Sequence, residues 1–180
     1  SAALEPSLVR EAEILKGLQG SEYIPKVEDL CLLQANIRGE ISQVRGLILS
    51  GVVGKALHHL PRSNWTMHSK SIIGAVFEAI KYAHDRNVVH MDIRPGNIIV
   101  DVDAGDTCRT MLSDWGCSLN TQDKLDKLEH FRGCTPYAHD CLLGKSFKAP
   151  AHQFMPNLDF ASLAYTFDHV HYGRLRWIFQ

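Results

Sequence analysis

Residues 90–100, HMDIRPGNIIV, and residues 112–116, LSDWG, decide how this chain of 180 residues is interpreted. The first stretch carries a carboxylate at Asp92 and a carboxamide at Asn97, and the second carries a carboxylate at Asp114. Mg²⁺ prefers oxygen ligands of these kinds, and a carboxylate that binds no metal can orient an attacking hydroxyl. The pattern therefore predicts a phosphoryl-transfer site, where positioning and charge neutralisation carry most of the catalysis.

Four residues receive roles in this predicted site. Asp92 is expected to accept a hydrogen bond from the incoming hydroxyl, and Arg94 to stand beside the transferred phosphate as a cation. Asn97 and Asp114 are expected to be the metal ligands for Mg²⁺. An isolated Asp-x-Gly or His-x-Asp is usually no more than a turn. The order and spacing of all the pieces together favour Asp92, Arg94, Asn97 and Asp114 as catalytic residues.

The composition is that of an ordinary globular protein, with 45% hydrophobic residues, 22% charged residues and a formal net charge of -1. A charge so close to zero gives no basic field for nucleic acid. No apolar run approaches the roughly 20 residues that a membrane helix needs. We therefore expect no nucleic-acid partner and no membrane partner. Five cysteines without close pairing favour reduced thiols and an intracellular, cytoplasmic or nuclear, location.

Hydrophobic spacing predicts the secondary structure. The expected order is a helix over 7–19, strands over 27–33 and 44–50, a long helix over 65–86, a short buried strand at 88–89, a hairpin from 98–100 and 111–112 around a polar turn at 101–110, and a buried helix over 158–172. The apolar side of the long helix is expected to carry Ile72, Ile73, Val76, Phe77, Ile80 and Tyr82 or Ala83. Residues 119–156 are irregular in pattern.

This arrangement resembles the eukaryotic-type protein kinase domain, in which the two opening stretches would be the catalytic loop and the metal-binding turn. The resemblance covers nearly the whole chain. The other matching segments are 10–18 (REAEILKGL) with the C-helix, 47–52 (LILSGV) with the strand that leads to the hinge, 80–90 with the long helix before the catalytic loop, 133–138 (GCTPYA) with the substrate-binding end of the activation segment, and 159–164 (DFASLA) with the buried helix.

The resemblance implies an α+β, protein-kinase-like fold. Residues 1–52 would form a partial N-lobe, made of the C-helix, two strands and the hinge. Residues 53–180 would form a mainly helical C-lobe. The implied cofactors are ATP and Mg²⁺, and the implied partner is a protein substrate.

The resemblance also assigns residues around the nucleotide. Glu11 stands where the family has the glutamate that pairs with a strand lysine. Leu49 would be the gatekeeper, the backbone of Ser50 and Val52 would face adenine, and Ile99 would form the floor beneath it. Asn97 and Asp114 would reach the nucleotide through Mg²⁺.

Two structural roles follow from the same resemblance. Leu15, His90 and Trp115 would stack with a residue near Leu32 and join the two lobes. Asp159 would anchor the backbone of the catalytic loop.

The kinase branch is suggested by smaller features. Arg94-Pro95 resembles the lysine-proline of serine/threonine kinases. Residues 158–167 with 173–177 look most like the casein-kinase-I-like and the fungal or effector-type branches. The GCTPYA segment favours a protein substrate.

Several positions depart from the family pattern. Met91 replaces the arginine that usually precedes the catalytic aspartate, and Trp115 replaces a phenylalanine. Residues 138–140 read Ala-His-Asp where the family has Ala-Pro-Glu, so Asp140 is expected to keep the carboxylate role, paired with Arg174 or Arg176. No lysine and no glycine run precedes the first helix. The chain is thus expected to be the middle of a kinase domain, incomplete at both ends.

Such a chain should expose apolar surface where the missing strands would pack, and self-association or a partner is expected to cover it.

Three functions remain open at this point. The first is a serine/threonine protein kinase that uses Mg-ATP. The second is a pseudokinase that serves as a protein-interaction module, because the phosphate-binding lysine is missing. The third is a small-molecule phosphotransferase, because Pro-Gly-Asn and Asp-Trp-Gly also resemble the aminoglycoside kinase family.

Overall fold

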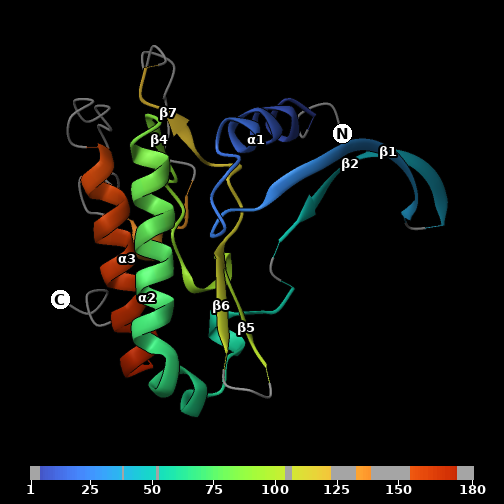
Figure 1. The fold of residues 1–180 in the computed structure, drawn as a ribbon. Coiled ribbons are helices and arrows are strands. Elements are labelled where there is room, and N and C mark those ends of the chain that lie inside the picture. The colour runs from blue at the N-terminus through green and yellow to red at the C-terminus, as the bar shows by residue number, and fades with distance from the viewer. Residues whose placement is uncertain are drawn as a thin grey trace.

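The computed structural model describes residues 5–37, 39–51, 53–103, 107–122, 133–138 and 155–173 (Figure 1). It has the mixed α and β content that the sequence predicts. The helices are α1 (Glu5–Gly17), α2 (Arg62–His84) and α3 (Met155–Tyr172), with short 3-10 turns η1 (Leu57–His59), η2 (Pro95–Asn97) and η4 (Thr135–Tyr137). The strands are β1 (Lys26–Ile37), β2 (Glu40–Ser50), β3 (Lys55–Ala56), β4 (Val88–Val89), β5 (Ile98–Val102), β6 (Cys108–Leu112) and β7 (Leu119–Asn120).

Helices α2 and α3 lie side by side and antiparallel (Figure 1). Trp65 near the start of α2 stacks on Phe167 near the end of α3, with ring centroids 5.5 Å apart. His84 at the end of α2 meets Phe160 near the start of α3 at 5.3 Å. No helix in the described part of the chain combines the length and apolarity that a bilayer crossing demands.

The burial of α2 differs in part from the predicted apolar side. Ile72, Val76 and Ile80 are buried as expected, but Ile73 is 37% exposed and Phe77 is 44% exposed. Each of them follows a buried residue by one position, and one residue turns an α-helix by about 100°. Ile73 and Phe77 therefore lie at the edge of the buried stripe. Phe77 still packs against Phe160 of α3, with ring centroids 5.3 Å apart.

The hairpin after the catalytic loop is longer than predicted. β5 pairs antiparallel with β6, from Ile98 opposite Leu112 to Val102 opposite Cys108, and β3 pairs with the other edge of β5. An ion pair between Asp101 and Arg109 joins the strands within the stretch expected to be a polar turn. Asn97 directly precedes β5, and Asp114 follows β6 by two residues. Because the strands are antiparallel, the two predicted metal ligands lie at the same end of the sheet.

The β1–β2 hairpin also exceeds its predicted bounds and projects away from α2 and α3 (Figure 1). Its turn is closed by the amide of Gly39, which donates to Asn36 Oδ1 at 2.9 Å, and Gly39 has the positive φ that glycine tolerates. Leu30, Ile41 and Ile48 are exposed on this hairpin. Apolar side chains are therefore exposed on this hairpin, and their burial by a partner or a second copy stays a prediction.

Candidate active site

The catalytic-loop backbone is anchored by the buried carboxylate of Asp159 in α3. The amide of His90 donates to Asp159 Oδ2 at 2.7 Å, and the amide of Met91 donates to Oδ1 at 2.9 Å. His84 Nε2 lies 2.9 Å from the same Oδ2. Met91 has a φ of 69°, a region that a residue with a long side chain rarely occupies. The two amide bonds to Asp159 hold the chain in this strained turn, as the family resemblance implied for Asp159.

His90 links this anchor to the metal-binding turn. Its ring is fully buried, and burial lowers the pKa of the imidazole despite the nearby carboxylates. A neutral ring matches its contacts, since Nδ1 accepts the amide of Asp92 at 3.2 Å and Nε2 donates to the carbonyl of Ser113 at 3.1 Å. His90 therefore fixes the backbone before Asp92 and the backbone before Asp114 together.

Asp92 lies at the centre of the site and is only 8% exposed. Its Oδ2 accepts hydrogen bonds from Arg94 Nε at 3.1 Å and from Asn97 Nδ2 at 2.9 Å. Its Oδ1 accepts the amide of Cys134 at 2.6 Å. Asn97 Nδ2 also donates to the carbonyl of Asp92 at 2.9 Å. Charge-assisted bonds of this kind hold a carboxylate in one orientation.

Asn97 and Asp114 lie on adjoining backbone segments. The carbonyl of Asn97 accepts the Ser113 amide at 2.8 Å and the Ser113 hydroxyl at 3.0 Å. The Asp114 side chain is 51% exposed, and its Oδ2 lies 3.9 Å from Arg94 Nη2. These contacts place Asp114 in reach of the cation that also binds Asp92.

The donor set fits Mg²⁺. Because the Asn97 amide nitrogen donates to Asp92, its side-chain oxygen is the atom that could bind a metal, together with the exposed carboxylate of Asp114. The described residues hold no group of three or more His, Cys, Asp or Glu side chains suited to a metal. Mg²⁺ does not need one, since it typically takes one or two protein oxygens, substrate phosphates and water.

Glu11 reaches the same turn from α1. Its Oε1 accepts the Trp115 amide at 3.1 Å. Burial raises the pKa of this carboxyl, the charge of Asp114 raises it further, and the Trp115 amide opposes both effects. No cation of the described residues forms an ion pair with Glu11. The described part of the chain thus gives Glu11 an amide partner in place of the lysine that the family pattern leads one to expect.

The expected stack between the lobes is present in three of its four members. Leu15 and Trp115 are fully buried, and the His90 and Trp115 rings meet edge-on at 4.6 Å. Trp115 Nε1 donates to the carbonyl of Leu112 at 2.9 Å, which satisfies the indole that replaces the family's phenylalanine. The side chain of Leu32 lies outside the described residues.

The hinge residues are only partly placed. Leu49 is 41% exposed near the end of β2, and Ile99 lies half-buried opposite Met111 in the β5–β6 pair. A Cβ at Gly51 would lie 2.0 Å from Met111 Cε, so the hinge backbone packs against β6. Ser50 ends β2 with its hydroxyl bonded to Glu28. Val52 lies outside the described residues, and the adenine-binding roles remain predictions.

Cys134 is the site residue that sequence reasoning missed. The segment 133–138 was expected near the substrate, yet nothing in its spacing indicates that one amide binds Asp92. Burial raises the pKa of the Cys134 thiol, the charge of Asp92 raises it further, and Arg94 opposes both effects.

The carboxylate role expected for Asp140 remains a prediction. Asp140 lies outside the described residues, as do His139, Arg174 and Arg176.

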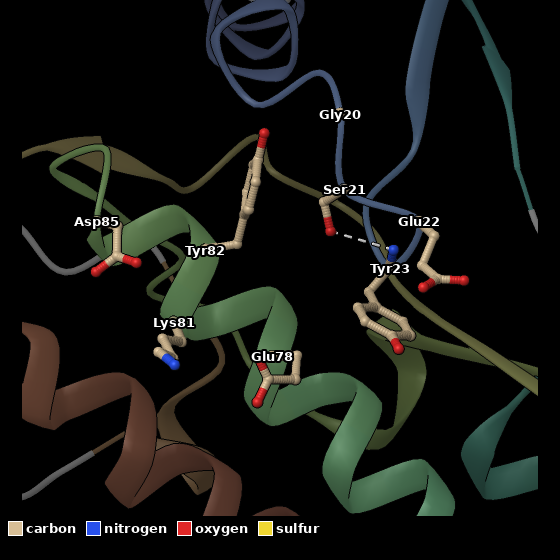
Figure 2. A pocket seen from close by; sticks show the side chains of 8 residues that line it. All are labelled: Gly20, Ser21, Glu22, Tyr23, Glu78, Lys81, Tyr82 and Asp85. Carbon is tan, nitrogen blue, oxygen red and sulfur yellow. Dashed lines mark hydrogen bonds between the residues drawn. The ribbon is translucent and has the colours of Figure 1, made fainter.

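A separate cavity of about 280 Å³ lies between the loop at residues 20–23 and α2 (Figure 2). It is lined by Glu22, Glu78 and Asp85, with Lys81 as its cation. Figure 2 shows these side chains around Tyr82, whose hydroxyl donates to the carbonyl of Gln19 at 2.8 Å. None of the predicted site residues lines this cavity, so it is no part of the site around Asp92.

The chain matches the protein kinase domain family over residues 2–169. It belongs to that family. Serine/threonine-protein kinase PknJ of Mycobacterium tuberculosis is 41% identical over 108 residues, which cover 60% of this chain and 17% of that kinase. Mitogen-activated protein kinase MKC1 of Candida albicans is 24% identical over 122 residues, which cover 66% of this chain and 23% of that kinase.

A third relative is the liver/testis phosphorylase b kinase gamma catalytic chain of Bos taurus, 37% identical over 62 residues, or 33% of this chain and 14% of that protein. The chain therefore spans less than a quarter of the length of these curated relatives. Family membership confirms the predicted kinase resemblance and fold class. The suggested branch within the family remains a prediction.

Proposed function

We propose that this chain is the core of a serine/threonine protein kinase domain that transfers phosphate from Mg-ATP to a protein hydroxyl. The observation that carries the proposal is the geometry of Asp92. Its carboxylate is buried, bonded on one oxygen by Arg94 and Asn97, and turned with the other oxygen toward the segment at Cys134. A carboxylate held in this way is pre-organised to orient one hydroxyl.

The proposed chemistry assigns a step to each residue. A serine or threonine hydroxyl donates to Asp92 Oδ1, in place of the Cys134 amide. As its oxygen forms a bond to the phosphorus, the bond to the leaving diphosphate breaks and the hydroxyl proton passes to Asp92. Arg94 neutralises charge between Asp92 and Asp114. Asn97 and Asp114 would hold Mg²⁺, which supplies charge neutralisation on the phosphate oxygens when bound.

The nucleotide assignments form part of the same proposal. Leu49, Ser50, Val52 and Ile99 would surround adenine, and Glu11 would receive the lysine that binds phosphate. The thiols at Cys31, Cys108 and Cys134, which form no disulfide with a described residue, support a reducing, intracellular location.

A pseudokinase that acts as an interaction module is the second candidate. The observation that favours it is Glu11, whose described partner is the Trp115 amide and no lysine. The exposed apolar side chains of the β1–β2 hairpin suit either candidate, since self-association or a partner would cover them. Sedimentation at increasing protein concentration tests self-association.

A thermal-shift titration with ATP, with and without magnesium, separates the candidates. A ligand that binds only the folded state raises Tm with its occupancy. The kinase proposal expects a magnesium-dependent rise that Asp114→Asn removes, followed by phosphate transfer to a serine peptide in preference to small alcohols. If millimolar ATP gives no shift and no transfer occurs, the interaction module is the better description. Preferred transfer to small alcohols would favour a small-molecule phosphotransferase.

A further inference from the structure

A second cavity, of about 220 Å³, lies beside the catalytic loop. It forms where the start of α2, the turn η1, the turn η2 and the end of α3 meet. Its polar lining consists of His58, Arg62, His169 and His171, and Pro95 of the catalytic loop lines it too. No aspartate or glutamate is among its described lining residues. The cavity therefore offers one permanent positive charge and three imidazoles to a ligand.

The catalytic loop connects this cavity to Asp92. A Cβ built at Gly96 would lie 2.9 Å from Arg94 Nη1 and 3.8 Å from His58 Cε1, so His58 and the Arg94 guanidinium flank the same glycine. Arg94 Nε in turn donates to Asp92 at 3.1 Å. The cavity is thus one side chain away from the proposed catalytic carboxylate.

The segment at residues 133–138 makes the second connection. Tyr137 Oη and His169 Nδ1 lie 2.6 Å apart, and the Cys134 amide of the same segment donates to Asp92 Oδ1. The segment that bonds Asp92 at Cys134 therefore also contacts a residue that lines the cavity, His169.

Charge distinguishes this cavity from the one in Figure 2. There, Glu22, Glu78 and Asp85 outnumber Lys81, and no residue of the catalytic loop takes part. Beside Pro95, the Arg62 guanidinium is exposed and forms no ion pair with a residue of the described ranges. A cation that forms no ion pair within the described ranges favours an anionic ligand at the edge of the site.

We infer that this cavity recognises an anionic side chain, carboxylate or phosphate, near the acceptor residue of a peptide substrate. The inference rests on the proposed function, because it names the substrate class of the same site. It assigns a preference for acidic or already phosphorylated peptides, with Arg62 as the main contact and the imidazoles as additional hydrogen-bond donors.

Fluorescence anisotropy tests the inference without requiring catalysis. Three labelled peptides of equal length carry one central serine, flanked by glutamates, by phosphoserines or by lysines. Each is titrated with the wild-type chain and with Arg62→Glu, His171→Glu and Lys70→Glu. Lys70 is the matched control, because it is exposed on the same helix about 12 Å further along, beyond the range of unscreened charge at physiological salt.

We expect the glutamate and phosphoserine peptides to bind more tightly than the lysine peptide. Arg62→Glu should weaken their binding by about threefold to tenfold, and Lys70→Glu should not. His171 lines the same cavity from α3, so His171→Glu should also weaken binding. This second variant still tests the inference if Arg62→Glu lowers Tm. Tighter binding of phosphoserine than of glutamate would assign the cavity to phosphate, and the reverse order to carboxylate.

Equal affinity for all three peptides would overturn the inference. An equal loss of affinity for the acidic peptides in Arg62→Glu and Lys70→Glu would also overturn it. A phosphate-transfer assay on the same peptides separates the two proposals. Transfer without anion preference would leave the kinase proposal standing and remove this inference. Anion-selective binding without transfer would remove the kinase proposal and leave an anion-binding surface.

Discussion

Asp92 accepts hydrogen bonds from two segments of the chain, its own loop and the segment at residues 133–138. Arg94 and Asn97 hold one carboxylate oxygen, while the amide of Cys134 holds the other. The first two donors come from the same loop and are available before any substrate arrives. The third comes from the segment expected to hold the peptide. Only the oxygen bonded to Cys134 is therefore suited to exchange its partner for a substrate hydroxyl.

Asp92→Asn tests this assignment at the level of one atom. The substitution preserves shape but removes the base, so the rate of phosphate transfer should fall by about 10²–10⁴-fold. Single-turnover measurements at saturating Mg-ATP would report the loss. Asp101→Asn, on the β5–β6 hairpin, is the control and should retain wild-type rate. A fully active Asp92→Asn enzyme would remove Asp92 from the mechanism.

Glu11→Gln tests the electrostatics of the metal-binding turn. Burial and Asp114 raise the pKa of Glu11 above its usual 4.5. The folded state therefore binds this proton more tightly than the unfolded state, so the stability that protonation contributes is lost as pH rises through the raised value. Glutamine keeps the acceptor for the Trp115 amide without the charge. We expect Glu11→Gln to melt a few degrees above wild type at pH 7, with the gap closing toward pH 4.5.

A matched control is available on the same helix. Glu13 is exposed two residues further along α1, about half a turn round the helix, and Glu13→Gln should leave Tm close to that of the wild type at every pH. Thermal melts of the three proteins across pH would decide the matter. A Glu11→Gln protein less stable than wild type at pH 7 would show that the ionised carboxylate stabilises the turn.

At the scale of elements, α3 holds the loop that bears Asp92 mainly through Asp159, and the hydroxyl of Thr166 on the same helix donates to the carbonyl of Ile93 at 3.2 Å. Asp159 accepts hydrogen bonds from the backbone amides of His90 and Met91. The bonds span 69 and 68 positions of sequence and tie the buried helix to the loop that bears Asp92. Loss of this carboxylate should loosen the loop without touching any proposed ligand.

Asp159→Asn and Asp114→Asn should therefore behave differently. The first removes a buried charge from three donors and should cost about 2–4 kcal/mol of unfolding free energy. The second changes a half-exposed carboxylate, and asparagine tolerates the positive φ at position 114, so the cost should stay within about 0.5 kcal/mol. Urea unfolding measures both. Equal losses would make Asp114 a structural residue.

For the molecule as a whole, α1 is joined to the helical part by the stack of Leu15, His90 and Trp115. Leu15 is fully buried in the same core that contains α2 and β6. This core couples the end of the chain that carries Glu11 to the turn that carries Asp114. A defect in it should therefore destabilise the protein as one unit.

Leu15→Ala should lower the free energy of unfolding by about 2–5 kcal/mol, because it leaves a cavity in a packed core. Ile48→Ala, on the exposed face of β2, is the control and should change it by less than about 0.5 kcal/mol. Denaturant titration followed by tryptophan fluorescence would report both. A neutral Leu15→Ala would mean that α1 contributes little to the stability of the folded chain.

The predicted helices and main hairpins are close to the observed ones because their signals are periodic. An apolar residue every third or fourth position, or a run of β-branched residues, is visible in sequence. The two-residue strand β4 was predicted from its paired valines, whereas β3 (Lys-Ala) and β7 (Leu-Asn) were missed because neither contains a β-branched residue and both are too short to show a period. The exposed side of α2 at Ile73 and Phe77 was misjudged because an apolar residue at the edge of a stripe looks like core.

By itself the sequence determined the kinase fold class, the main elements and the residue types proposed for catalysis, because local spacing and local order encode them. Only the tertiary structure decided the partners of those residues. The amide of Cys134 on Asp92 spans 42 positions, and the amide of Trp115 on Glu11 spans 104. Contacts over such separations form when the packing of whole elements offsets the entropy of closing long loops, and no local pattern specifies them.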